Sequence, residues 1–107
     1  MRWYKELYIG ETLRNDAALV QAEVRAFLPP PEIYLICLST NGVDLMDITP
    51  TVALKQIGAK NRTWDIIGMA RGKDEAVKLA AAIIEDVWKK TGALDVRTFV
   101  DGQMIAD

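Results

Sequence analysis

A glycine-containing turn between an apolar run and a helical pattern is the segment of the sequence best suited to bind a ligand. It reads Gly68-Met-Ala-Arg-Gly-Lys-Asp74, and the free N–H groups at the start of the following helix would favour an anion. Its spacing differs from that of a P-loop, because three residues separate the two glycines and Asp74, not Ser or Thr, follows the lysine. Asp74 and Glu75 would also repel a phosphate, which favours a simple helix-stabilising turn.

Positive side chains near the expected strand ends support a second hypothesis. In α/β domains ligands bind at strand ends, so Arg62 together with Arg71, Gly72 and Lys73 is a candidate site for an anionic metabolite. In this hypothesis the protein is a small-molecule sensor, and neither a cofactor nor a metal is implied.

Paired carboxylates raise a minor alternative, an acid–base enzyme. Asp44 and Asp47 are three residues apart, which could place both on one helical face, as proton transfer or a hard cation would require. Apolar residues interleave with them, however, and this pattern favours a solvated face over an apolar one. Asp65 and Arg71 complete this hypothesis, but no residue is assigned a catalytic role.

Composition excludes several classes of active site. The 107 residues include no His and one Cys, so Ser-His-Asp and Cys-His chemistry, Cys-based zinc sites and intrachain disulfides are all ruled out. Cys37 lies in an apolar run and is predicted to be buried and inert. The net charge of -2 argues against nucleic-acid binding. Without a signal-like or membrane-length apolar segment, we expect one soluble, cytoplasmic α/β domain over residues 1–107.

Hydrophobic periodicity predicts most of the elements that would position these residues. Residues 3–9 are typical of a strand, and residues 11–28 of an amphipathic helix that three prolines end. Residues 33–38 and 64–70 are apolar on both faces, as central strands are. Residues 73–90 form the clearest amphipathic helix, with Gly92 as its C-cap.

The remaining segments are less regular. Residues 43–57 fit two short helical turns separated at Pro50, with Thr49 as an N-cap. Residues 95–100 are predicted to be an edge strand, and residues 101–107 a frayed tail. The order favours an α+β fold of two layers, a ferredoxin-like βαββαβ arrangement with a helical insertion around 43–57. The alternative is a three-layer α/β open sheet.

Several segments together carry a resemblance to known sequences. They are Trp3–Glu11, Tyr34–Leu38, Leu45–Ile48, Ile67–Ala76 and Thr91–Arg97. The chain resembles a group of small uncharacterised proteins from anaerobic, Firmicute-type bacteria. The resemblance implies cytoplasmic bacterial proteins with no known activity, so it assigns no catalytic residue.

The leading functional expectation is a non-catalytic module that acts by self-association or by docking onto a protein partner. Its basis is the pair of strands that are apolar on both faces, since an uncovered sheet face would expose a larger apolar patch than monomers usually carry. Formation of a homodimer would cover such a face.

Overall fold

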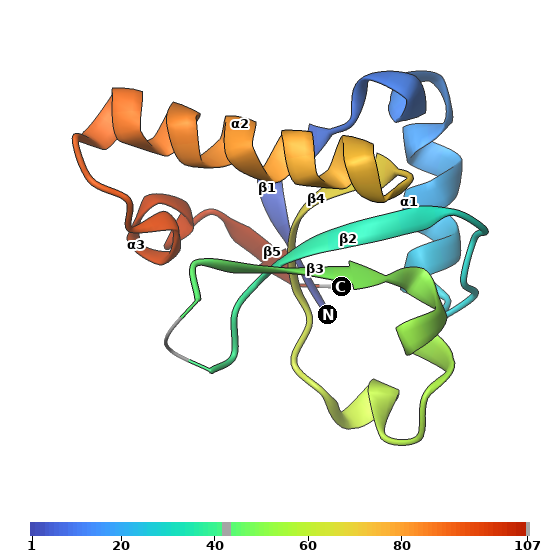
Figure 1. Ribbon diagram of the computed structural model, residues 1–107. Helices are drawn as coiled ribbons and strands as arrows, with labels where there is room; N and C mark the ends of the chain where they lie inside the picture. The colour runs from blue at the N-terminus through green and yellow to red at the C-terminus, as the bar shows by residue number, and fades with distance from the viewer. Residues whose placement is uncertain (42–43, 107) are drawn as a thin grey trace.

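The protein folds around a five-stranded mixed sheet, as the computed structural model shows (Figure 1). The structure describes residues 1–41 and 44–106. The strands are β1 (Arg2–Ile9), β2 (Ile33–Leu38), β3 (Met46–Pro50), β4 (Asp65–Arg71) and β5 (Met104–Ala106). The α-helices are α1 (Ala17–Arg25), α2 (Lys73–Thr91) and α3 (Val96–Val100), and three 3-10 helices are η1 (Glu11–Asp16), η2 (Thr51–Lys55) and η3 (Ala59–Asn61).

The order of strands across the sheet is β3-β2-β4-β1-β5. β1 pairs with β4 in parallel, whereas β2–β3, β2–β4 and β1–β5 are antiparallel pairs. The helical connections from β1 to β2 and from β4 to β5 therefore join strands that run in opposite directions. A ferredoxin-like split βαβ unit instead joins parallel strands through its helix. The α+β class is confirmed, and the ferredoxin-like topology is not.

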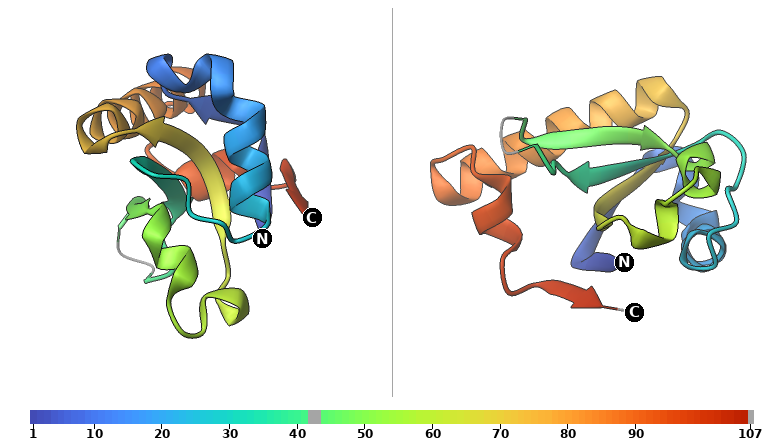
Figure 2. Two further views of the ribbon diagram at one scale, coloured as in Figure 1. Left: turned by 90° about the vertical axis from the view of Figure 1, so that its right-hand side faces the viewer. Right: turned by 90° about the horizontal axis from the view of Figure 1, so that it is seen from below.

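Both faces of the sheet are covered by helices of the same chain. Alternate residues of a strand point to opposite faces, and accordingly Leu35 and Cys37 pack in a core with α1, η1 and η2. Ile36 and Leu38 pack in a second core with α2 and α3. The result is three layers, with α1 and α2 on opposite sides of the sheet (Figure 2). This layering is that of the alternative expectation, but in a mixed sheet.

The elements with the strongest periodicity are where the sequence predicts them. The strands at 3–9, 33–38 and 64–70 correspond to β1, β2 and β4, and β4 is the middle strand. The long helix is α2, and Gly92 caps it in the left-handed conformation at φ 72°. The helix expected over 11–28 is divided into η1 and α1, which are continuous in the chain.

The prediction of two helical turns over 43–57 is wrong in its first half. Met46–Pro50 is the edge strand β3, in which Ile48 pairs with Ile36 and Met46 pairs with Leu38. Thr49 lies in this strand and caps no helix, while the second half is helical as η2. Pairing with β2 outweighs the weak local preference of a five-residue segment. Val43 lies outside the described residues.

The C-terminal prediction is also corrected. Residues 96–100 form α3, because Val96 and Val100 are both buried and the Asp95 side chain accepts a hydrogen bond from the Thr98 N–H. The last strand is β5, inside the segment 101–107 that was expected to be a frayed tail, and it pairs with β1. Asp107 is not among the described residues. Over residues 1–41 and 44–106, no helix is long and apolar enough to cross a membrane.

Candidate functional site

A cleft of about 740 Å³ lies at the carboxyl ends of the parallel strands β1 and β4. These two strands are in register there, with Ile9 beside Met69. The walls come from the segment after β1, the turn after β4 and the first half of α2. The lining residues are Ile9, Gly10, Glu11, Thr12, Arg14, Arg71, Gly72, Lys73, Asp74, Glu75, Lys78, Leu79 and Ala82.

The chain leaves these two neighbouring strands toward opposite faces of the sheet. After β1 it enters η1 and α1, which pack on one core, and after β4 it enters α2, which packs on the other. Adjacent connections that diverge in this way leave a crevice between them, and such crevices are the usual ligand sites of open sheets. The α2 amino terminus borders the crevice, and its first-turn N–H groups lack acceptors within the helix.

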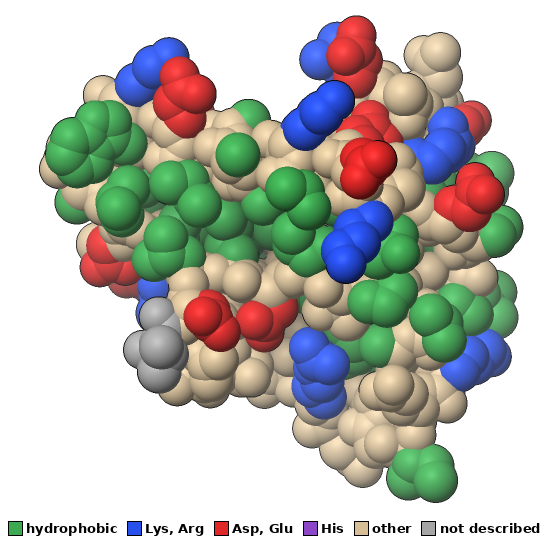
Figure 3. All heavy atoms as spheres, viewed as in Figure 1, with side chains coloured by type: hydrophobic (Ala, Val, Ile, Leu, Met, Phe, Trp, Pro, Cys, Tyr) green, Lys and Arg blue, Asp and Glu red, His purple; other side chains and the backbone are tan. Residues whose placement is uncertain are grey.

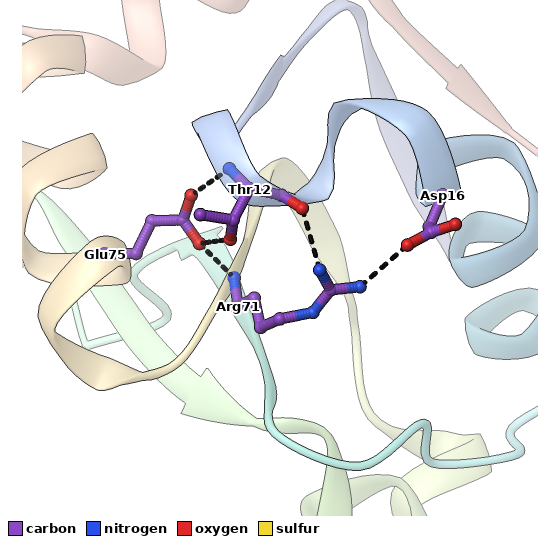
Figure 4. Close-up of polar contacts among 4 residues, drawn as sticks. All are labelled: Thr12, Asp16, Arg71 and Glu75. Carbon is purple, nitrogen blue, oxygen red and sulfur yellow. Dashed lines mark hydrogen bonds and ion pairs between the residues drawn. The ribbon is translucent and has the colours of Figure 1, made fainter.

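Glu75 ties the two walls together (Figure 4). Its Oε1 accepts a hydrogen bond from the Thr12 backbone N–H at 2.7 Å. Its Oε2 accepts one from the Thr12 hydroxyl at 2.7 Å and one from the Arg71 backbone N–H at 2.8 Å. One carboxylate therefore joins η1 to the turn that precedes α2.

Arg71 closes the same network from the other side. Its Nη1 donates to the Thr12 carbonyl oxygen at 2.7 Å, and its Nη2 forms an ion pair with Asp16 Oδ2 at 3.0 Å. The guanidinium is thus engaged with the wall, although the side chain is still 37% exposed. A ligand could contact only the part of the Arg71 side chain that is exposed to the cleft.

Two glycines make this arrangement possible, for different reasons. A Cβ at Gly10 would lie 2.7 Å from both Cδ and Oε1 of Glu75, so a side chain there would displace the Glu75 carboxylate from its hydrogen bonds. Gly72 has space around it but adopts φ 81°, a conformation that other residues rarely adopt. Its N–H donates to the Glu32 carbonyl oxygen at 2.7 Å, and it is not a free donor for a ligand.

The contacts of Glu75 keep it ionised. Partial burial alone would raise the pKa of its carboxyl group, but the hydrogen bonds from Thr12 and Arg71 and the charge of Arg71 lower it further than burial raises it. The net pKa is below the ordinary value. The negative charge of Glu75 is therefore neutralised within the wall.

Three other basic side chains line the cleft. Arg14, Lys73 and Lys78 belong to no ion pair within the part of the chain that the structure describes. The acidic residues Glu11 and Asp74 also border the cleft. With Glu75 and Arg71 engaged in the wall, three positive groups and two negative groups are left for a ligand.

The structure brings together three of the four residues predicted to bind a ligand. Arg71, Gly72 and Lys73 line the cleft. Arg62 does not, because it precedes β4 while Arg71 ends it, and its guanidinium lies over the Trp64 ring at 4.0 Å from the centroid.

Sequence reasoning did not identify the first wall of the cleft. Gly10, Thr12 and Arg14 follow β1, and Lys78 lies one turn into α2. The available signal was Gly10 directly after a strand, which marks a close approach of two chain segments. The contact partner, Glu75, is 63 residues away from Thr12 and had no local signature.

The proposed acid–base residues are dispersed. Asp65 is buried at the start of β4 and accepts both hydrogen bonds of a bidentate pair with Arg2, at 2.7 and 2.9 Å. Asp44 is exposed before β3 and binds Asn41, and Asp47 lies within β3. Asp65 and Arg71 lie at opposite ends of one strand, so these residues do not converge on one substrate.

Comparison of the chain with protein-family models, with curated proteins and with solved structures finds no match in any of the three. The resemblance to small bacterial proteins is untested by these comparisons and stays a prediction.

Proposed function

We propose that the protein binds a small anionic molecule, one that carries a carboxylate or phosphate group, in the cleft between η1 and α2. The observation that carries the proposal is the position of the cleft, at the carboxyl ends of two parallel strands whose connections diverge. The volume, about 740 Å³, lies in the range of small-molecule sites, about 300–1,000 Å³.

The charges of the cleft indicate the ligand class. Lys73 and Lys78 project from the first half of α2, and Arg14 extends from the opposite wall. The positive end of the α2 dipole adds to them. Among the described residues, these three basic side chains form no ion pair with a carboxylate of the protein. An anionic group bound between the two walls would therefore pair with them.

The hydrogen bonds of Glu75 within the wall of the cleft favour a binding role over a catalytic one. A general base must be within hydrogen-bond reach of the proton it removes. The Glu75 carboxylate accepts three hydrogen bonds from the protein, and its low pKa makes it a weak base. We therefore propose a sensor or carrier and assign no catalytic residue.

A thermal-shift screen tests the proposal. The panel contains nucleotides, sugar phosphates and dicarboxylates, and we expect one class to raise the melting temperature in a saturable manner. A ligand at one hundred times its Kd stabilises the folded state by about 2.7 kcal/mol. That corresponds to a shift of about 10 °C or more for a domain of this size.

Matched variants locate the site. Lys73→Gln combined with Arg14→Gln removes two of the cations, and the shift should fall to a small fraction of that of the original chain. Lys55→Gln combined with Lys60→Gln removes two positive charges from η2 and η3, outside the cleft, and should leave the shift intact. An unchanged shift in the double variant, or no shift with any member of the panel at millimolar concentration, would overturn the proposal.

Self-association, the leading expectation from the sequence, loses its original basis. The apolar faces of β2 and β4 are covered by the chain's own helices, so a partner is not needed to cover the sheet. A self-association surface would therefore involve the outer side of a helix or an edge of the sheet. The cytoplasmic location stays a prediction.

A further inference from the structure

An apolar row runs along α2, and its residues belong neither to the core nor to the lining of the cleft. Val77, Ala81, Ile84 and Trp88 recur at intervals of four, three and four residues, which places them in line on one face of a helix. Val77 is 49% exposed and Trp88 is 54% exposed. An indole this accessible, in line with aliphatic side chains, is unusual for a surface that stays in water.

The row is part of a wider apolar surface. Met46 and Ile48 of β3 pair with Leu38 and Ile36, which belong to the core beneath α2, so they lie on the α2 side of the sheet. Figure 3 shows hydrophobic side chains in a band across this face, below a charged upper rim. The band, defined as the α2 row with Met46 and Ile48, therefore extends beyond a single helix.

On one side of the row, four charged residues alternate in sign along the helix. They are Asp74, Lys78 and Glu85, each three or four residues from a member of the row, and Lys89, one turn after Glu85. Asp74 and Lys78 also line the cleft. Lys73, four residues before Val77, lies on the opposite side of the row from these four. All four are exposed, and Lys89 forms an ion pair with Glu85 at 2.7 Å. If two copies of this helix pack antiparallel, each of these charges lies opposite a charge of the other sign.

We propose that a second copy of this chain covers the band, with the two α2 helices packed antiparallel about a twofold axis. The axis would pass near residue 82, the midpoint of both the apolar row and the charges. Trp88 of each copy then lies against Val77 of the other, and Ala81 lies against Ile84. Lys78 meets Glu85, and Asp74 meets Lys89, so the surface is complementary to itself as an isologous interface requires.

A parallel arrangement of the two helices is disfavoured by the same charges. It would place Lys78 against Lys78 and Glu85 against Glu85, and like charges across an interface weaken association. The sign pattern therefore selects the orientation as well as the partner.

The first experiment measures mass by sedimentation equilibrium over a concentration series, without any ligand. We expect the 11.9 kDa chain to double its mass as the concentration rises. Trp88→Glu, which alters an exposed side chain outside the cleft, should raise the dimer Kd by about tenfold or more while far-UV circular dichroism stays unchanged. A chain that is monomeric at every concentration, or a Trp88→Glu variant that dimerises normally, would overturn the proposal.

A charge-exchange experiment tests the antiparallel register. Lys78→Glu and Glu85→Lys each place like charges together in a homodimer, so each variant alone should associate weakly. An equimolar mixture restores both opposite-charge contacts in the heterodimer and should recover association. Lys55→Glu, in η2 on the other face of the sheet, serves as the matched control and should leave the mass distribution unchanged. If mixing has no effect, the register is wrong.

Discussion

Glu75 is the residue on which the wall of the cleft depends. It accepts hydrogen bonds from two N–H groups and one hydroxyl that belong to two separate segments of chain. A neutral amide cannot replace it, since one of its two terminal atoms is a donor and would face another donor. The negative charge is therefore required for the local structure.

Glu75→Gln should lower the free energy of unfolding at pH 7 by about 1 kcal/mol, because it disturbs three hydrogen bonds, of which two are exposed and one is part-buried. The folded-state pKa of Glu75 is lower than its ordinary value of 4.5. Its contribution is consequently present above pH 4.5 and is lost as the pH falls through the folded-state pKa. Urea denaturation from pH 7 to pH 3 should show the difference between variant and original narrowing.

Glu11→Gln provides the control for this comparison. It removes a carboxylate from an exposed position in the same cleft. We expect a small change in stability, within about 0.5 kcal/mol. A constant difference between the Glu75→Gln variant and the original chain down to pH 3 would show that the charge of Glu75 has no role.

Cys37 should be inert in the folded protein. It is 2% exposed in β2, and burial raises the pKa of its thiol to about 12, an effect that the nearby charge of Arg62 only partly offsets. The thiolate is the reactive form, so labelling by an aromatic disulfide at pH 8 should be about a thousandfold slower in the folded than in the urea-unfolded chain. Equal rates in the two states would contradict the burial of this residue.

At the scale of elements, β5 closes one edge of the sheet although it has only three residues. Met104 packs against the core beneath α2, and its neighbour Ile105 points to the other side and is 55% exposed. Substitutions at these two neighbouring positions can therefore be compared. Only in a strand that packs on the core should Met104 contribute more to stability than Ile105.

Met104→Ala should reduce the free energy of unfolding by about 1–2 kcal/mol, because it removes partly buried methylene groups. Ile105→Ala should have an effect within about 0.5 kcal/mol. Urea denaturation of both variants measures the contrast. Two equally neutral substitutions would mean that β5 does not contribute to the fold.

At the scale of the whole molecule, the two core layers share one sheet. Strands β1, β2 and β4 each supply alternate side chains to both cores. The Cα radius of gyration, 13.0 Å, is that of a single domain, for which about 13 Å is typical at 100 residues. Neither layer can lose its packing without exposing the strands that hold the other.

Unfolding should therefore be a single transition. Trp3 and Trp64 are buried in the core beneath α1, so their fluorescence reports on that layer, while far-UV circular dichroism is dominated by α2 on the other. In a Trp88→Phe background, which removes the exposed indole, the two signals should change at the same urea concentration. A fluorescence transition that precedes the loss of helix would show that the layers unfold separately.

The sequence by itself determined the elements whose information is local. The apolar runs of β2 and β4 and the helical periodicity of α2 follow from the alternation of side chains along one segment, and Gly92 marks where α2 ends. Arg71, Gly72 and Lys73 could be proposed as ligand-binding residues for the same reason, since they stand between a strand and a helix that the pattern already located.

Only the tertiary structure decided how those elements pair. Met46–Pro50 is a strand because it pairs with the otherwise open edge of β2. In the same way, β5 is a strand because it pairs with the open edge of β1. Neither strand could be predicted from its own short sequence. The direction of β1 relative to β4, and with it the position of the cleft, depends on pairing between distant residues. The contact between Thr12 and Glu75 joins residues 63 apart, and no local propensity records a contact of that range.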